Sequence, residues 1–110
     1  MIVIRPPRFQ RRAKLAGLSE YDIVEIIRFL AKRPNAGAVI PGAGGARKVR
    51  VRLSGRGKRG GARLIYAIVL HSTAIALLDV YAKSEQGDLT AHERKAIASS
   101  IREIEEGFDR

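Results

Sequence analysis

With 110 residues, of which 45% are apolar, the chain has the size of one domain with a modest core and not the composition of a disordered tail. Its 21 lysines and arginines against 11 aspartates and glutamates give a formal net charge of +10, which predicts a polyanionic partner, nucleic acid before anionic lipid. The absence of cysteine excludes disulfides and thiolate chemistry, and without a membrane-length apolar run or a signal peptide we expect one soluble cytoplasmic domain, residues 1–110, with no membrane partner.

The first third of the chain predicts an edge strand followed by two helices. Residues 1–4 favour β structure and are closed by a proline pair. Residues 8–15 suit two helical turns that Gly17 ends as a C-cap, and Ser19 then has the form of an N-cap followed by first-turn acids. Apolar residues at helical spacing continue this second helix until Pro34 stops it. They are Ile23, Ile26, Ile27, Leu30 and Ala31.

The middle of the chain predicts an antiparallel meander of three strands. Residues 35–45 are small and glycine-rich, which is typical of a loop. Residues 48–53 alternate between apolar and cationic side chains, as a half-buried strand does. A turn at 54–61 leads to the apolar run 62–70, which is typical of a central strand, and residues 74–82 form a further strand.

The last segment predicts a helix that completes an α+β domain. Thr90 and Glu93 fit a capping box, and apolar residues follow on one helical face. The element order β-α-α-β-β-β-α predicts a small twisted antiparallel sheet packed against helices. The apolar residues of the final helix are Ile97, Ile101, Ile104 and Phe108.

Basic residues are concentrated in one region that has no acidic neighbours. No aspartate or glutamate occurs from Ile26 through Leu78. Within that span Lys48, Arg50 and Arg52 occupy alternate positions, so one face of a strand is purely cationic. With acids nearby this would be an ordinary solvated hairpin, but without them the row suits a phosphate backbone, where each contact adds salt-sensitive affinity. We therefore predict a nucleic-acid-binding surface.

Several other patterns have ordinary interpretations. The glycine-rich residues 42–48 lack the spacer and the Lys-Ser/Thr ending of a nucleotide-binding P-loop, and they precede a strand instead of a helix. His71 and His92 have no evident acidic partner and are interpreted as structural, and Tyr66 as a core residue with a tethered hydroxyl. No cluster of carboxylates suggests a metal site, so we expect no cofactor.

The chain also resembles a known family along nearly its whole length. The matching segments are Phe9 and residues 18–20, 34–37, 40–50, 57–66 and 78–85. They are similar to the RelE/ParE superfamily, the toxins of bacterial type II toxin–antitoxin systems, and within it to the HigB-like branch. The resemblance implies a RelE-like fold and a ribosome-dependent mRNA endonuclease (mRNA interferase) that cuts A-site codons and inhibits translation. In that family the 2′-OH attacks the adjacent phosphate without a metal ion.

The same resemblance implies roles for individual residues. Arg50 and Arg63 would stabilise charge on the phosphate oxygens, Lys83 would protonate the leaving 5′ oxygen, and Lys48 is the candidate base for the 2′-OH. The family places a base-stacking tyrosine near the chain end, and here no tyrosine follows Tyr81, so Tyr81 and His92 are the replacements considered. The residues expected to hold RNA are Arg47, Arg52, Arg56, Lys58, Arg59 and Tyr81.

Charge and resemblance together predict the partners. An acidic antitoxin, HigA-like and DNA-binding, would either cover the surface of Lys48, Arg63 and Lys83 or block entry into the ribosome by its bulk. The ribosome and its mRNA are the other expected partners. Two alternatives stay open: a ParE-like toxin directed at DNA gyrase, and a non-catalytic RNA- or ribosome-binding protein. Basic residues at all four matching positions favour the nuclease.

Overall fold

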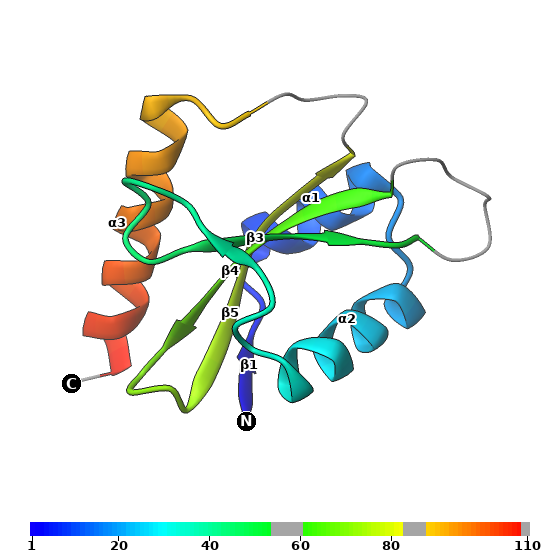
Figure 1. The fold of residues 1–110 in the computed structure, drawn as a ribbon, viewed down its shortest axis with the longest axis horizontal. Helices are drawn as coiled ribbons and strands as arrows, with labels where there is room; N and C mark the ends of the chain where they lie inside the picture. Colours follow the sequence, from blue (N-terminus) through cyan, green and yellow to red (C-terminus); the bar gives the residue numbers. More distant parts are fainter. Residues whose placement is uncertain (54–60, 83–87, 109–110) are drawn as a thin grey trace.

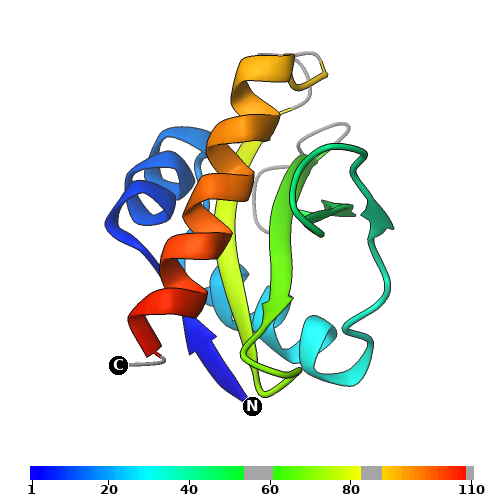
Figure 2. The ribbon, with the colours of Figure 1, turned by 90° about the vertical axis from the view of Figure 1, so that its left-hand side faces the viewer.

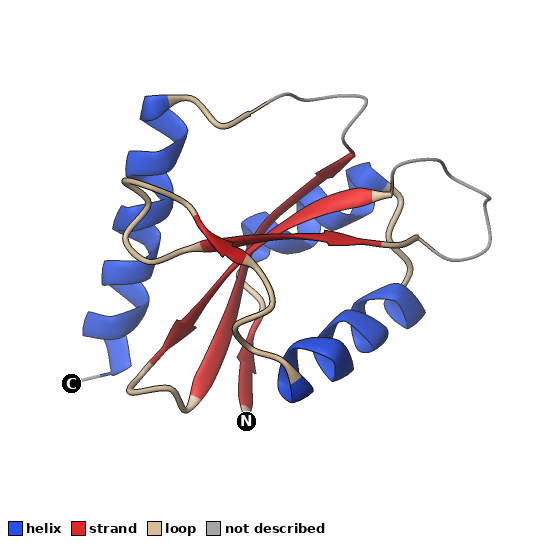
Figure 3. Cartoon of the chain, viewed as in Figure 1, coloured by secondary structure: helices blue, strands red, loops and turns tan. Residues whose placement is uncertain are grey.

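The computed structural model of the chain describes residues 1–53, 61–82 and 88–108. Strands form one sheet in the order β1-β5-β4-β3-β2, with helices on both of its faces (Figure 1 and Figure 3). Among the described helices, none is both long and apolar enough to cross a membrane. The elements in chain order are β1 (Ile2–Ile4), α1 (Pro7–Ala16), α2 (Glu20–Lys32), β2 (Ala38–Val39), β3 (Arg47–Val51), β4 (Ala62–Val69), β5 (Ala74–Ala82) and α3 (Ala91–Phe108).

The predicted α+β architecture is confirmed, and the sheet differs from the prediction in two respects. β1 lies parallel to β5, with Ile2 opposite Ala74, so the sheet is mixed and not wholly antiparallel. The two-residue strand β2 pairs with the start of β3, Ala38 opposite Lys48, where the sequence predicted only a loop. The first difference depends on a partner far away in sequence, and the second on a strand too short to show a periodic pattern.

Local sequence explains where α1 and α2 begin and end. α1 has a proline in its first turn, where no backbone donor is needed, and it ends at Gly17, whose φ of 86° is the left-handed C-cap conformation. α2 begins with a capping box: the Ser19 hydroxyl accepts from the Asp22 N–H, and the Asp22 carboxylate accepts from the Ser19 N–H. The apolar residues that these helices bury are Phe9, Ala13, Ala16, Ile23, Ile26 and Leu30.

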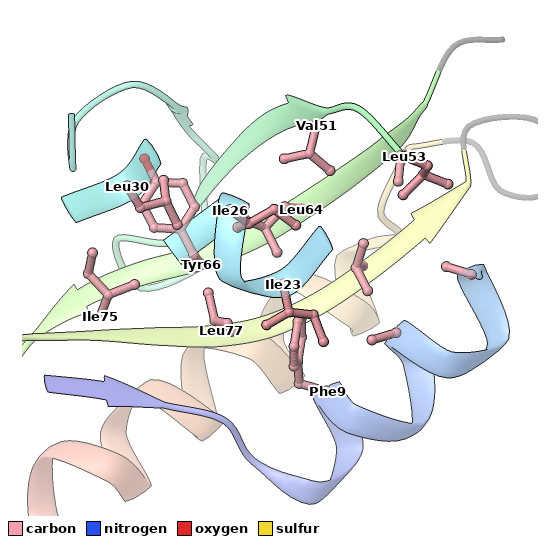
Figure 4. Packing of buried hydrophobic residues seen from close by; sticks show 14 residues of the cluster. Phe9, Ile23, Ile26, Leu30, Val51, Leu53, Leu64, Tyr66, Ile75 and Leu77 are labelled. Carbon is pink, nitrogen blue, oxygen red and sulfur yellow. The ribbon is translucent and has the colours of Figure 1, made fainter. Parts of the chain in front are cut away.

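The sheet has a hydrophobic core on each face. α1 and α2 cover the face that we call the α1/α2 face, where Leu64, Tyr66 and Leu77 are completely buried (Figure 4). α3 crosses the opposite face, which we call the α3 face (Figure 2). There Ile65 packs in one cluster with Ile97 of the helix. Because side chains alternate along a strand, the consecutive residues of β4 serve two different cores, which explains its uninterrupted apolar sequence.

The turn between β4 and β5 has an unusual backbone. Leu70, His71 and Ser72 have φ values of 55°, 54° and 66°, which side chains with a Cβ rarely adopt. Two contacts hold this turn: the Thr73 hydroxyl donates to the Leu70 carbonyl oxygen at 2.6 Å, and the Leu70 N–H donates to the Glu105 carboxylate at 3.0 Å. The second contact ties the turn to α3.

Candidate active site

Three side chains form a row across β3, β4 and β5. Arg50 lies opposite Arg63 in the β3–β4 ladder, and Arg63 lies opposite Tyr81 in the β4–β5 ladder. Opposed residues on paired strands project from the same face of a sheet, and Tyr81 belongs to the core beneath α3. The row therefore stands on the α3 face, with two cations side by side and a phenol beyond them.

Lys48 and Asp88 extend this row. Lys48 precedes Arg50 by two positions on β3, so both side chains project from the same face. The Lys48 Nζ lies 3.5 Å from Oδ1 of Asp88, which stands three residues before the start of α3. The exposed fractions of the two side chains are 34% and 96%, so this open ion pair contributes little to stability. What it provides is a carboxylate beside the cationic row.

The described part of the chain does little to neutralise the two arginines. Nη1 of Arg63 is buried and has no hydrogen-bond partner among the residues that the structure describes. Asp79, the acidic residue of β5, is only 3% exposed, and its Oδ1 accepts from Nε of Arg12 on α1 at 2.7 Å. Because Asp79 is engaged by α1, its charge is compensated there and the row keeps its positive charge.

Tyr81 differs from an ordinary exposed tyrosine. Burial raises the pKa of its phenol, the charges of Asp88 and Asp79 raise it further, and the charge of Arg63 opposes them. The phenol is therefore protonated at neutral pH and can donate a hydrogen bond to a ligand bound beside Arg63.

Arg47 lies on the other face of the sheet, because it is opposite Tyr66 in the ladder. Its Nη1 donates to the Gly37 carbonyl oxygen at 2.7 Å and to that of Asn35 at 3.4 Å. The Tyr66 hydroxyl donates to the Pro34 carbonyl oxygen at 2.7 Å and accepts from the Gly37 N–H at 2.9 Å. Together these bonds fasten the loop before β2 to β3 and β4, and they confirm the interpretation of Tyr66 as a core residue with a tethered hydroxyl.

The structure brings Lys48, Arg50, Arg63 and Tyr81 together on one face. Arg52 follows Arg50 at the same alternation and is exposed, whereas Arg47 contacts loop carbonyl groups on the opposite face. The other predicted site residues, Lys83, Arg56, Lys58 and Arg59, lie outside the described residues.

Asp88 is the residue that sequence reasoning missed. The one local signal was its position shortly before the capping box, where the Thr90 N–H donates to Glu93 at 2.8 Å. Such a position is typical of a polar loop and does not indicate contact with Lys48, which is distant in sequence. In the described part of the chain, no three histidines or carboxylates are grouped so that they could hold a metal ion.

A solved structure with a similar fold supports the architecture described above. The chain matches no protein-family model. Its fold is similar to that of the E. coli toxin RelE, solved in the free state as a mutant with two arginines replaced by alanine. The TM-score is 0.55 at 15% sequence identity, and the match covers 90% of this chain and 94% of that chain. Structural similarity at this identity establishes the fold and leaves the activity to be argued from the site. The chain therefore has the RelE-like α+β fold.

Proposed function

We propose that this protein is the toxin of a type II toxin–antitoxin pair and that it cuts mRNA in the ribosomal A site. The observation that supports the proposal best is the opposed pair Arg50 and Arg63, flanked by Lys48 and Tyr81, on a fold shared with a RelE toxin. Two cations side by side suit a phosphate on whose oxygens charge builds up during reaction. The net charge of +10 favours the ribosome, itself a polyanion, as the platform on which the protein works.

The proposed reaction is attack of a 2′-OH on the adjacent phosphate. Arg50 and Arg63 hold the phosphate oxygens, and the Tyr81 hydroxyl offers a hydrogen-bond donor beside them. Its ring is only 5% exposed, which does not suit the expected stacking on a base. As O2′ bonds to phosphorus, the bond from phosphorus to O5′ breaks, and Lys83 gives its proton to O5′ as general acid. The products are a 2′,3′-cyclic phosphate and a free 5′-OH.

Two groups beside the row can accept the proton of the 2′-OH. Lys48 would accept it at its amine nitrogen, and Asp88 would accept it at a carboxylate oxygen. Because Nζ and Oδ1 lie 3.5 Å apart, one group can take the proton while the other orients it. Asp88 thus joins Lys48 in the proposed machinery.

Primer extension on an mRNA incubated with the purified protein, with and without translating ribosomes, tests the proposal. We expect cuts within A-site codons only when ribosomes are present. Arg63→Ala and Lys83→Ala should abolish them, whereas Arg11→Ala, at an exposed position on α1, should not. Intact mRNA from folded wild-type protein would refute the proposal. DNA damage with whole mRNA would indicate the gyrase-directed alternative, and ribosome binding without cuts would indicate a non-catalytic binder.

The proposal includes a cognate antitoxin. An acidic segment of that protein would compensate the excess positive charge of this chain, and the antitoxin would either cover the cationic row or prevent entry into the ribosome. A structure of the complex in which both the row and the ribosome-facing surface stay exposed would contradict it.

A further inference from the structure

A mostly apolar groove of about 530 Å³ separates α2 from the end of β3. Tyr21, Ile26 and Phe29 of α2 line one wall, and residues 50–53 line the other. Tyr21 is 64% exposed and Phe29 38% exposed, so both rank among the large apolar side chains that the chain leaves in water. Large exposed apolar side chains gathered around a groove mark a binding surface more often than a passive one.

The β3 wall of this groove is an open strand edge. β2 pairs only with Arg47 and Lys48, and no other strand of the described structure lies on that side of β3. The Ile40 N–H donates to the carbonyl oxygen of Ala46, just before β3, at 2.9 Å. Because backbone groups alternate along a strand, the even-numbered residues of β3 direct their N–H and C=O groups away from β4, toward this open edge. The N–H and C=O groups of Arg50 and Arg52 therefore face the groove without a strand partner among the described residues.

The alternation of side chains along β3 determines which sequence an added strand would need. Val51 and Leu53 are buried on the α1/α2 face, next to the wall formed by α2, whereas Arg50 and Arg52 project from the α3 face. A strand paired with this edge would place its own side chains alternately on the same two faces. Its favourable partners are thus apolar on one face and acidic on the other.

We propose that this groove binds an extended acidic segment of a partner protein, which adds to the sheet beside β3. Its apolar side chains would pack against Phe29 and Val51, and its carboxylates would pair with Arg50 and Arg52. Backbone donors and acceptors in alternation match the backbone of a peptide, whereas the sugar-phosphate backbone of RNA has no such alternation. The acids in the groove are already engaged, since Asp22 caps α2 and Glu25 lies 3.3 Å from Arg28.

Selection of random peptides of about ten residues, displayed against the folded protein at physiological salt, tests the proposal. We expect the selected peptides to alternate apolar residues with aspartate or glutamate. Tyr21→Glu adds charge to the groove at an exposed position in the first turn of α2, where an acid is tolerated, and should weaken binding by at least about tenfold. Leu15→Glu, which makes the same change at the 78% exposed Leu15 of α1, should leave binding intact.

Backbone methylation of a selected peptide then tests strand addition itself. A methyl group on alternate amides should abolish binding at the positions that face β3 and spare it at the others, and the amides of Arg50 and Arg52 should become protected from hydrogen exchange. Peptides that are merely acidic, that show helical spacing, or that bind the Tyr21→Glu variant equally well would overturn the proposal. This test requires no RNA cleavage, so it can succeed or fail independently of the proposed nuclease activity.

Discussion

Arg50 and Arg63 face each other directly across the β3–β4 ladder. Like charges in opposed positions destabilise a sheet, and the buried Nη1 of Arg63 adds to that cost because no described residue accepts its hydrogen bond. A phosphate between the two guanidinium groups would relieve both penalties at once. The arrangement therefore suits the proposed phosphate, at some expense to the stability of the free protein.

Replacing one of these arginines should improve stability while it removes activity. We expect Arg50→Gln to raise the free energy of unfolding by about 0.2–1 kcal/mol, because the cross-strand repulsion disappears. The same change should slow cleavage by roughly 10²-fold. Urea unfolding and single-turnover cleavage measure the two effects. Arg11→Gln, on the exposed side of α1, serves as the control and should alter neither; a loss of stability in Arg50→Gln would contradict the argument.

Asp88→Asn should distinguish between the two candidate bases. If Asp88 accepts the 2′-OH proton, cleavage should fall by about 10²–10⁴-fold with ribosome binding unchanged. A loss below about tenfold would assign proton transfer to Lys48 and leave Asp88 a positioning role. Glu103→Gln, an exposed change of the same type on α3, should behave as wild type.

Tyr66→Phe should lower the stability of the protein without altering the cationic row of Lys48, Arg50 and Arg63. The substitution keeps the buried ring but leaves the Gly37 N–H and the Pro34 carbonyl oxygen without the hydroxyl that satisfies them. We expect a loss of about 1–3 kcal/mol in the free energy of unfolding. Tyr21→Phe, at a 64% exposed position, is the matched control and should change it little. Equal stability of the two variants would show that the clamp on this loop is unimportant.

His71→Gly should stabilise the protein. Glycine adopts the positive φ of this position without a steric penalty. Glycine also makes the unfolded chain more flexible, which lowers stability, but this effect is the smaller of the two. We therefore expect the free energy of unfolding to rise by about 0.5–1 kcal/mol. Gly61→Ala tests the same reasoning in the opposite direction, because Gly61 has φ 55° and a Cβ there would collide with the Val51 carbonyl oxygen. Thermal unfolding should shift upward in the first variant and downward in the second.

Tyr81 should make stability depend on pH in the alkaline range. The pKa of its phenol is raised in the folded protein from 10.0, mainly by burial, so the folded state holds this proton more tightly than the unfolded state does. The resulting stability is present below pH 10 and is lost as the pH rises from there through the folded-state pKa. Tyr81→Phe should remove this part of the decline, and the difference between the tyrosinate absorbance titrations of wild type and Tyr81→Phe should show a group that titrates above pH 10.

Much of the fold was predictable because its signals are local. The capping box at Ser19, the glycine after α1 and the alternation at Lys48–Val51 each determine the conformation of a few neighbouring residues. The parallel pairing of β1 was not predictable in this way, since the sequence of residues 2–4 does not record which strand they will meet. β2 was not predicted for another reason: its two residues are extended because they pair with β3, and not because of their own β propensity.

The candidate site was predictable where the alternation of side chains along a strand determines which face of the sheet they occupy. Period-two spacing placed Lys48 and Arg50 together, but the same rule puts Arg47 on the opposite face, where its guanidinium binds loop carbonyl groups. Its interpretation as an RNA-binding residue thus stays a prediction without support from its position. The contact of Asp88 with Lys48 depends on how the chain returns from β5 to α3, which no local pattern encodes.

The parallel pairing of β1 with β5 also constrains the order in which the protein folds during its own synthesis. Residues 2–4 are made about seventy residues before their partners, residues 74–76. The closing contact of the sheet therefore has one of the longest sequence separations in the molecule, and such contacts form late. A nascent chain that stops before Ala74 cannot complete this sheet, so truncated products should be unfolded.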